Sequence, residues 1–382
     1  MQTAFYIVIC FASIVLMFYI LVMIYFISGI LTSKKLVHTH ENLQTKISVI
    51  IPVRNEAQNI NACLNSVSIQ TYPEKLFEVI IIDDSSDDET QSIVRDFCKK
   101  NSNFSAIALK DFPGNITGKK NAIQAGIKNA KGSLIVTTDG DCTVHHEWLK
   151  TIASFYETEK PKMILGPVAF HTGKNLFQKI QSLEFLGLIG ITEASANLKN
   201  PIMCNGANLA YEKSVFEKVE GFSGNAEISS GDDVILMHKL KKEFPDSVRF
   251  LYSVQTIVQT HSKQNFSEFF DQRIRWASKA KHYSDKFSHT VSLLVFLINF
   301  LVAFVIIFAL ETLSLRNIYL ALILLCFKCL IDFFFLFLAA RKWHKTSLMK
   351  FFLPAEFFVI IYTSFVGLAS NKKYRWKGRV VK

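Results

Sequence analysis

The first 33 residues contain no charged side chain. An uncharged, apolar run of this length exceeds the roughly 20 residues that a helix needs to cross the hydrocarbon core of a bilayer. The run is also longer than the apolar core of a typical signal peptide, and no small-residue cleavage site follows it. The sequence therefore predicts an uncleaved transmembrane helix over 1–33.

No RNA- or DNA-binding motif is present, although the 382 residues carry a formal net charge of +11. The basic tail 371–382 follows an apolar stretch, which favours anionic lipid over nucleic acid as its partner. The seven cysteines are scattered and indicate no disulfide framework, which fits a reducing cytosol. Cys326 and Cys329 form a C-x-x-C pair inside an apolar run without His or further Cys ligands nearby, so we expect helix packing rather than a metal or redox site.

Half of the residues are hydrophobic and Phe occurs 34 times, with the excess at the two ends of the chain. Three C-terminal apolar runs, 290–310, 318–340 and 351–370, are predicted membrane helices. The second contains Lys328 and Asp332, four residues apart on one helical face. Either charge alone would be costly in lipid, so we expect the two to pair or to face the protein interior.

The basic residues around the apolar runs predict the orientation of the chain. Lys34 and Lys35 follow the first run, so the positive-inside rule places the following domain in the cytosol, on a multi-pass protein of the cell (inner) membrane. The segments 341–350 and 371–382 are both basic, so both should be cytosolic. The run 351–370 is then a re-entrant or interfacial segment, or it spans the membrane and the basic tail is an exception to the rule.

The middle of the chain, 46–286, has the composition of a globular α/β domain. Short apolar runs predict buried strands over 47–51, ended by Pro52, and over 78–82 and 133–138, with helices between them. Alternating strands and helices predict a largely parallel sheet, and such sheets bind ligands at the carboxyl ends of their strands. Acidic residues follow two of these strands, which is the first indication of a site.

Asp139 and Asp141 flank a glycine at the end of a predicted strand. Two converging carboxylates suit Mg²⁺ or Mn²⁺, and such an ion can neutralise a departing diphosphate. The alternative is a solvated acidic turn. Asp84 also closes a strand and can accept a hydrogen bond from a base or ribose or cap the next helix. Lys119, just after Gly118, can meet a phosphate.

Two further motifs carry candidate residues. Asp233 closes the sequence Gly-Asp-Asp at the start of a predicted helix, where a carboxylate can cap the helix or serve as general base. Gln272, Arg275 and Trp276 lie in a helical stretch before the second apolar run. Arginine suits a diphosphate and a Trp face suits a sugar ring, although both residues also favour a membrane boundary.

Taken in order, these motifs resemble the inverting family 2 glycosyltransferases, and more closely the membrane branch that includes cellulose, chitin and hyaluronan synthases and ceramide-glucosyltransferase-like enzymes. The resemblance covers about 47–276. It is carried by Val49-Ile50-Ile51-Pro52-Val53-Arg54-Asn55-Glu56, Ile82-Asp83-Asp84-Ser85-Ser86, Gly118-Lys119, Asp139-Gly140-Asp141, Gly231-Asp232-Asp233 and Gln272-x-x-Arg275-Trp276.

The resemblance implies a GT-A fold, the nucleotide-diphospho-sugar transferase fold, over 46–286. It implies that Pro52, Glu56 and Asp84 contact the nucleoside, with Lys119 and Asp139 on the nucleotide side. It further implies a metal on Asp141, Asp233 as general base and Arg275 at the diphosphate. Trp276 and Gln272 would line the acceptor site, and Gly206, in Cys-Asn-Gly-Ala-Asn, matches an acceptor-lining segment of relatives.

The chain departs from the polymer synthases in having few membrane helices, one before the domain and two or three after it. The stretch 176–198 is apolar and amphipathic and is expected, with 266–286, to lie at the membrane interface. These features favour transfer from a UDP-sugar to a lipid-linked or membrane-docked acceptor, assisted by Mg²⁺ or Mn²⁺. Synthesis of a short polysaccharide by a processive enzyme is the alternative, and a non-catalytic membrane scaffold a remote one.

Overall fold

The computed structural model describes residues 2–33, 42–111, 118–171, 173–223, 232–279, 283, 285–369, 374–376 and 379–381. A seven-stranded sheet in the order β3-β2-β1-β4-β7-β5-β8 forms the core of the middle domain. β1, β2, β3 and β4 are parallel, whereas β7 runs antiparallel to both of its neighbours. The strands are β1 Ile47–Val53, β2 Phe77–Asp83, β3 Phe104–Ala108, β4 Leu134–Thr137, β5 Met163–Leu165, β7 Leu209–Glu212 and β8 Val248–Phe250.

Pro52 was expected to end the first strand, and this was wrong, because β1 continues to Val53. Pro52 pairs with Ile82 of β2, but the pairing of β1 with β4 stops at Ile50. Pro52 therefore occupies an edge-like position with one neighbouring strand, where the missing N–H of a proline is tolerated.

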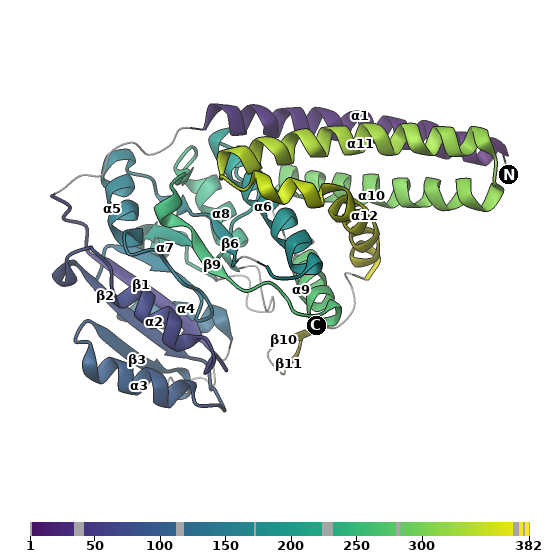
Figure 1. Cartoon of the computed structure of the whole chain (residues 1–382). Coiled ribbons are helices and arrows are strands. Elements are labelled where there is room, and N and C mark those ends of the chain that lie inside the picture. The colour runs from purple at the N-terminus through teal and green to yellow at the C-terminus, as the bar shows by residue number, and fades with distance from the viewer. Residues whose placement is uncertain are drawn as a thin grey trace.

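Helices cover the sheet and a second, two-stranded parallel sheet flanks it (Figure 1). The short strands β6 Val168–Phe170 and β9 Val258–Thr260 form this second sheet. The helices of the domain are α2 Ile60–Ser68, α3 Thr90–Lys100, α4 Lys119–Asn129, α5 Trp148–Glu159, α7 Lys213–Lys218 and α8 Asp232–Glu243, with 3-10 turns η1 Glu74–Leu76, η2 Leu109–Asp111 and η3 Val254–Thr256.

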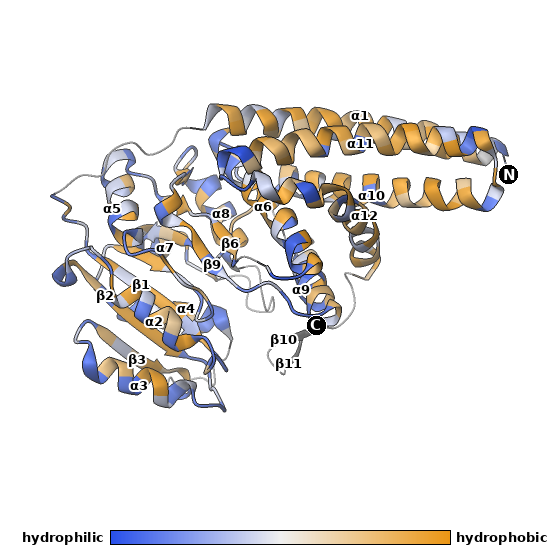
Figure 2. Cartoon of the chain, viewed as in Figure 1, coloured by the Kyte–Doolittle hydropathy of each residue, from blue (hydrophilic) through white to orange (hydrophobic). Residues whose placement is uncertain are grey.

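Within the described residues, four helices are long and apolar enough to cross a membrane by length and composition, with bounds Phe5–Thr32, Lys286–Thr312, Leu315–Lys342 and Thr346–Ala369. Three of them, α1 Gln2–Thr32, α10 Lys286–Thr312 and α11 Leu315–Lys342, run side by side and project from the domain (Figure 1). Hydrophobic residues line them over most of their length (Figure 2).

The fourth apolar segment differs in its placement. It consists of the 3-10 turn η5 Thr346–Phe351 and helix α12 Phe352–Ala369. α12 lies along the domain-side half of the bundle and does not reach the far end, where the N-terminus lies (Figure 1). The predicted basic tail 371–382 is described only over β10 Tyr374–Trp376 and β11 Arg379–Val381, which pair antiparallel.

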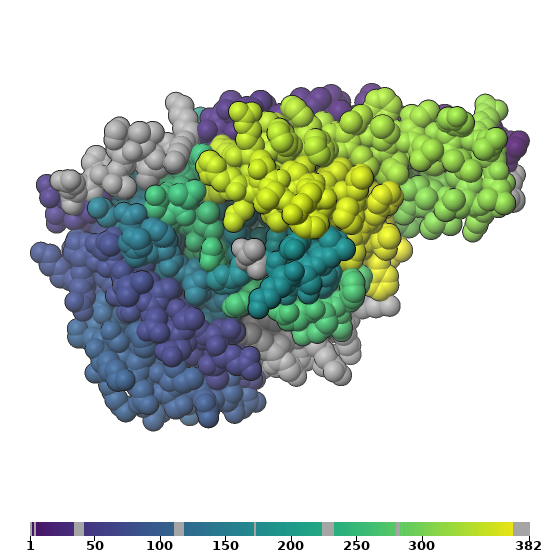
Figure 3. Space-filling view, in the orientation of Figure 1, coloured from purple at the N-terminus to yellow at the C-terminus, as the bar shows by residue number. Residues whose placement is uncertain are grey.

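Helix α6, Leu176–Asn197, joins the domain to the bundle. It packs against α1, α11 and α12, and Figure 3 shows α12 (yellow) directly over it (teal). Contacts are close: a Cβ on Gly29 of α1 would collide with the Ala194 carbonyl, and one on Gly190 would lie 3.2 Å from Cβ of Ala339. Buried Glu193 accepts hydrogen bonds from Ser33 at 2.6 Å and from Trp343 Nε1 at 3.0 Å. α6 is thereby fixed to the domain-side ends of α1 and α11.

The expected pairing of Lys328 with Asp332 is confirmed, with Nζ 2.8 Å from Oδ2. The fully buried Lys328 also forms an ion pair with Glu356 of α12. The Tyr19 hydroxyl of α1 donates to Asp332 Oδ1 at 2.6 Å. We call these four side chains the bundle cluster; they connect α1, α11 and α12 inside the protein.

Candidate active site

All eleven predicted site residues line one cavity of about 350 Å³; they are Pro52, Glu56, Asp84, Lys119, Asp139, Asp141, Gly206, Asp233, Gln272, Arg275 and Trp276. Gly231 of the Gly-Asp-Asp motif lies outside the described residues. The carboxyl ends of the parallel strands β1, β2 and β4 meet at one edge of the sheet, as the strand pairing requires, and this edge supplies one wall of the cavity.

Two tight turns present the side chains of the first two motifs. Asn55 and Ser85 both adopt left-handed backbone conformations, with φ of 51° and 57°. The Glu56 N–H donates to Thr90 Oγ1 at 2.8 Å, and Arg54 Nη1 donates to the Asp84 carbonyl at 2.6 Å. These bonds tie the loop after β1 to the loop after β2. Both loops are therefore held at the same end of the cavity.

Asp84 is buried and its carboxylate accepts a hydrogen bond from the Gly118 N–H at 3.0 Å. Gly118 has a φ of 103°, a conformation that favours glycine, and it precedes the first residue of α4. The next residue, Lys119, extends to Asp139, with Nζ 2.5 Å from Oδ1. Burial lowers the pKa of Lys119, but the carboxylates of Asp139 and Asp233 raise it by more, so the ammonium stays charged.

The Asp139–Gly140–Asp141 turn packs closely against the end of β1, where a Cβ on Gly140 would lie 2.8 Å from Val53 Cγ1. Asp141 is held less firmly than Asp139. Among described residues its carboxylate accepts a hydrogen bond only from the Cys142 thiol, at 3.5 Å. A carboxylate with such weak protein contacts retains oxygen lone pairs for a ligand. Asp139 and Asp141 thus provide carboxylate oxygens, the type of ligand that Mg²⁺ or Mn²⁺ prefers.

Asp233 is oriented by two main-chain donors. Oδ2 accepts a hydrogen bond from the Gly206 N–H at 2.9 Å and Oδ1 accepts one from the Val234 N–H at 2.9 Å. The Gly206 carbonyl in turn accepts from Thr137 Oγ1 of β4 at 2.8 Å. The segment around Gly206 therefore connects the carboxylate to the central sheet, and each oxygen retains room for a second hydrogen bond.

Helix α9, Phe266–Lys279, presents Gln272, Arg275 and Trp276 to the cavity. Its orientation depends on Arg273, which is buried and forms a bidentate ion pair with Glu184 of α6. The Arg273 guanidinium also lies 4.3 Å from the centroid of the Trp276 ring and donates to Gln272 Oε1 at 2.6 Å. Arg273 therefore holds the two side chains predicted to face the acceptor.

No sequence motif indicated this support. Tyr362 of α12 donates its hydroxyl proton to Glu184, so the ion pair connects α9, α6 and α12. The available signal was one acidic residue, Glu184, in the otherwise apolar helical turn 183–186. His261, Lys263 and Lys279 also line the cavity, and no spacing pattern indicated them.

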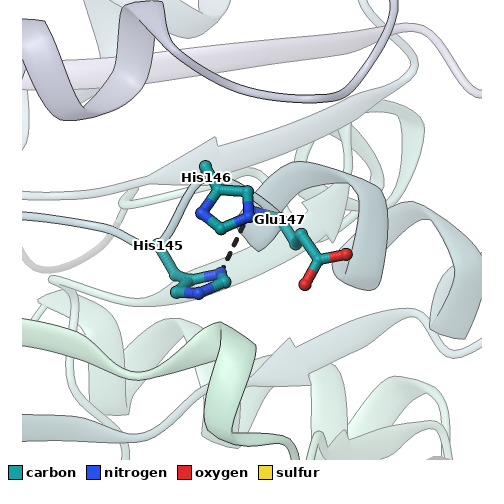
Figure 4. Close-up of side chains that lie close together, drawn as sticks. All are labelled: His145, His146 and Glu147. Atoms are coloured by element: carbon teal, nitrogen blue, oxygen red, sulfur yellow. Dashed lines mark hydrogen bonds between the residues drawn. The ribbon is translucent and has the colours of Figure 1, made fainter.

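A separate group, His145, His146 and Glu147, could hold a metal ion, since its ligand atoms lie within 4.8 Å of one another. These residues are not among those that line the cavity. Nδ1 of His145 accepts a hydrogen bond from the Glu147 N–H at 3.2 Å (Figure 4). Both His side chains are exposed, and the group is explained by the turn that starts α5.

Comparisons with known proteins agree on the family. Residues 48–220 match the glycosyl transferase family 2 model. The chain is 29% identical over 231 residues to glycosyltransferase AglE of Haloferax volcanii, covering 60% of this chain and 71% of that protein. It is also 29% identical over 238 residues to the poly-beta-1,6-N-acetyl-D-glucosamine synthase of Staphylococcus epidermidis, covering 60% of this chain. The match spans about half of the synthase, 53% of its length.

A solved structure shares the fold. The mannosyltransferase PcManGT from Pyrobaculum calidifontis, in complex with GDP-Man and Mn²⁺, superposes with a TM-score of 0.63 at 16% sequence identity. The superposition covers 97% of this chain and 100% of that one. The predicted fold class is confirmed, and four long apolar helices suggest a membrane protein. Residues 48–220 thus belong to a glycosyltransferase family 2 domain, which has a GT-A-like fold.

Proposed function

We propose that the protein is a membrane-bound, inverting glycosyltransferase that moves a sugar from a UDP-sugar to a lipid-linked or membrane-docked acceptor. The observation that carries the proposal is the common cavity, in which one wall comes from the sheet edge and another from α9. The sheet edge contributes the nucleotide-side residues Asp84 and Asp139. α9 contributes Trp276 and is bonded through Glu184 to α12, one of the apolar helices.

The nucleotide-sugar is proposed to bind at the sheet edge. Pro52, Glu56 and Asp84 would contact the nucleoside, while Lys119 and Arg275 would meet the diphosphate. Asp139 and Asp141 would hold Mg²⁺ or Mn²⁺, and a bound divalent ion supplies positive charge that stabilises a departing diphosphate. PcManGT, which shares the fold, is described with Mn²⁺.

Asp233 is the proposed general base. The acceptor O–H bond breaks, its proton passes to the Asp233 carboxylate, and the oxygen forms a bond to the anomeric carbon. The bond from that carbon to the diphosphate oxygen breaks on the opposite face, so UDP leaves with the electron pair and the configuration inverts. Fixed hydrogen bonds from Gly206 and Val234 support this role because they hold the carboxylate in one orientation.

The acceptor is proposed to lie against Trp276, Gln272 and Gly206. The arrangement of helices supports a membrane location: α1, α10 and α11 would cross the bilayer, and α12 would lie at the interface on the domain side. This gives the N-terminal helix, the domain and the basic tail an arrangement that satisfies the positive-inside rule, with the catalytic domain in the cytosol of a cell (inner) membrane protein.

The test is the substitution Asp233→Asn, which keeps the shape of the side chain and removes its basicity. We expect UDP binding to be unchanged and sugar transfer to membrane lipid extract to fall by about 10²- to 10⁴-fold, as for loss of a general base. Asp246→Asn, an exposed site on the same domain, is the matched control. Transfer by Asp233→Asn at the native rate would refute the base assignment.

The second candidate is a processive synthase of a short polysaccharide, favoured by the similarity to the Staphylococcus epidermidis synthase. The two candidates predict different products from one labelled UDP-sugar. A single sugar on each acceptor supports the lipid proposal, and a ladder of products supports the synthase.

A further inference from the structure

A second, smaller cavity adjoins the active-site cavity, and Asp233 lines both. It has a volume of about 140 Å³; the residues that line both cavities are Val168, Phe185, Asn205, Asp233, Trp276 and Lys279. We call it the acceptor chamber. The base is thus placed at a boundary between a polar cavity suited to a nucleotide and a separate chamber with a different lining.

The lining that belongs to the chamber alone is mostly apolar. Leu188 and Ile189 of α6, Met203 and Phe250 supply hydrocarbon or thioether surface. The Thr192 hydroxyl is used within α6, where it donates to the Leu188 carbonyl at 2.8 Å, so the methyl group is left for the chamber.

Two titratable groups of the lining remain neutral. Burial, reinforced by the negative charge of Asp233, raises the pKa of the Cys204 thiol well above its usual value. The same two causes raise the pKa of the Tyr283 phenol. A neutral, buried thiol behaves as a small hydrophobic group. Apart from the Tyr283 hydroxyl, the residues that line the chamber alone therefore offer few side-chain partners for hydrogen-bonding groups of a ligand, whereas Asn205 and Lys279 line both cavities.

We infer that the acceptor chamber receives the apolar carbon skeleton that carries the acceptor hydroxyl, so that the acceptor is a lipid alcohol rather than a sugar hydroxyl of a glycan. The inference rests on the proposed function, because it takes Asp233 as the base that meets the acceptor oxygen. Whatever carries that oxygen needs space next to Asp233, and the chamber is a space that Asp233 lines.

The part of the lining that belongs to the chamber alone favours an alkyl group over a sugar ring. A sugar ring brings several hydroxyls, and a buried hydroxyl without a partner is costly. The volume also sets a size, since an apolar cavity of roughly 150 Å³ holds one benzene molecule. The chamber at about 140 Å³ therefore fits about six carbon atoms next to the hydroxyl.

The position of α6 supports the same occupant. One face of α6 lines the chamber, and the helix packs against the apolar helices α1, α11 and α12. A lipid alcohol held by the surrounding bilayer can reach a chamber whose wall is part of the membrane-side structure. The apolar lining of the chamber and the contact of α6 with the apolar helices thus point to the same kind of ligand.

The experiment uses the full-length protein in detergent micelles and a series of primary alcohols from ethanol to octanol, with methyl β-glucoside as the sugar probe. The donor is whichever UDP-sugar the protein hydrolyses fastest without acceptor. Burial of each methylene is expected to raise kcat/KM for the alcohol about fourfold. The rise should stop near hexanol, and hexanol should exceed methyl β-glucoside.

Ile189→Phe fills the chamber, and Ile191→Phe is its matched control, because Ile191 lies on the same helix and does not line the chamber. We expect Ile189→Phe to remove most of the gain with chain length and to leave donor hydrolysis and UDP affinity unchanged. Partitioning of alcohols into micelles affects both variants equally. Leu188→Ala enlarges the chamber and should move the plateau to longer alcohols, which keeps the test decisive if Ile189→Phe does not fold.

The inference is overturned if kcat/KM is independent of chain length, if methyl β-glucoside is preferred to hexanol, or if Ile189→Phe and Ile191→Phe behave alike. A failure of the proposed function would give a different result, because Asp233→Asn would then transfer sugar as fast as the native protein. A chain-length dependence with an inactive Asp233→Asn supports both.

Discussion

Charged side chains gather in the active-site cavity and in the bundle cluster, and the two sets are balanced differently. In the bundle cluster Lys328 is 1% exposed and pairs with both Asp332 and Glu356, while Tyr19 satisfies a further carboxylate oxygen. In the cavity the Lys119–Asp139 pair is about one-third exposed on each side. Asp141 has only a weak contact among the described residues.

The difference distinguishes charge used for packing from charge left available for a ligand. A buried charge without a partner is costly, so a cluster among apolar helices must satisfy its members within the protein. A cavity open to water tolerates an excess of carboxylates, and such an excess can attract a cation. Removing a charge should therefore affect stability in the bundle and activity in the cavity.

Asp141→Ala should have the largest effect. The loss of a metal ligand is expected to reduce transfer by roughly 10³-fold, because a divalent ion contributes several kcal/mol of transition-state stabilisation. Mn²⁺ binding measured by calorimetry with UDP present should weaken in parallel, whereas the thermal unfolding midpoint should stay near that of the native protein. Native turnover would contradict the metal assignment, and the cavity carboxylates would then not be charge left available for a ligand.

Lys328→Met should act on stability instead. It leaves Asp332 and Glu356 without their cation and should destabilise the fold by about 3 kcal/mol. Denaturant unfolding in micelles measures this change, and the activity of the folded fraction should remain close to native. The triple variant with Asp332→Asn and Glu356→Gln, which has no buried charge, should recover most of the loss. An unchanged midpoint in Lys328→Met would show that the cluster is not structurally required.

Glu184→Gln tests the ion pair that lies between the two regions. It weakens the support of Arg273, and the expected loss is about 2 kcal/mol, roughly 30-fold in kcat/KM, as for a hydrogen bond to a charged group. As a positioning residue, Glu184 should affect KM for the acceptor more than KM for the UDP-sugar. Glu217→Gln, at an exposed position of α7, is the control. An equal rise of both KM values would indicate general loss of structure.

Tyr362→Phe should have the smallest effect, because it removes one hydroxyl donor to Glu184 and keeps the ring. The expected cost is about 1 kcal/mol, or roughly fivefold in acceptor kcat/KM. The assay should be run in vesicles, where α12 is supported by lipid. An unchanged acceptor kcat/KM in vesicles would show that the contact of α12 with Glu184 does not support the active site.

The sequence predicted the fold where the signal is local. The apolar runs of β1 and β2, and Asp84, Asp139 and Asp141 after their strands, indicated a parallel sheet with acidic residues at one edge. Strands of three residues, such as β6 and β9, are too short for a periodic pattern. Their positions depend on the tertiary fold and could not be predicted.

Prediction of the site from the sequence was also limited to local signals. Motif order brought together residues that line one cavity, and their roles stay predictions. The Glu184–Arg273 pair joins residues 89 positions apart, so no spacing rule could connect them. The acceptor chamber is likewise assembled from α6, β8 and α9 and has no counterpart in any single stretch of sequence.

The close packing of α6 against α1 and α11 has a consequence for which lipid hydroxyls can reach the active site. A helix fixed by glycine contacts and by Glu193 to α1 and α11 cannot easily change its distance from the bilayer. In the proposed membrane arrangement the active site would stand at a constant height above the lipid, and α6 would set that height. A lipid whose hydroxyl lies deeper must be drawn outward at about 0.8 kcal/mol for each methylene exposed. The protein would thus discriminate among lipids first by the distance that each must move out of the bilayer.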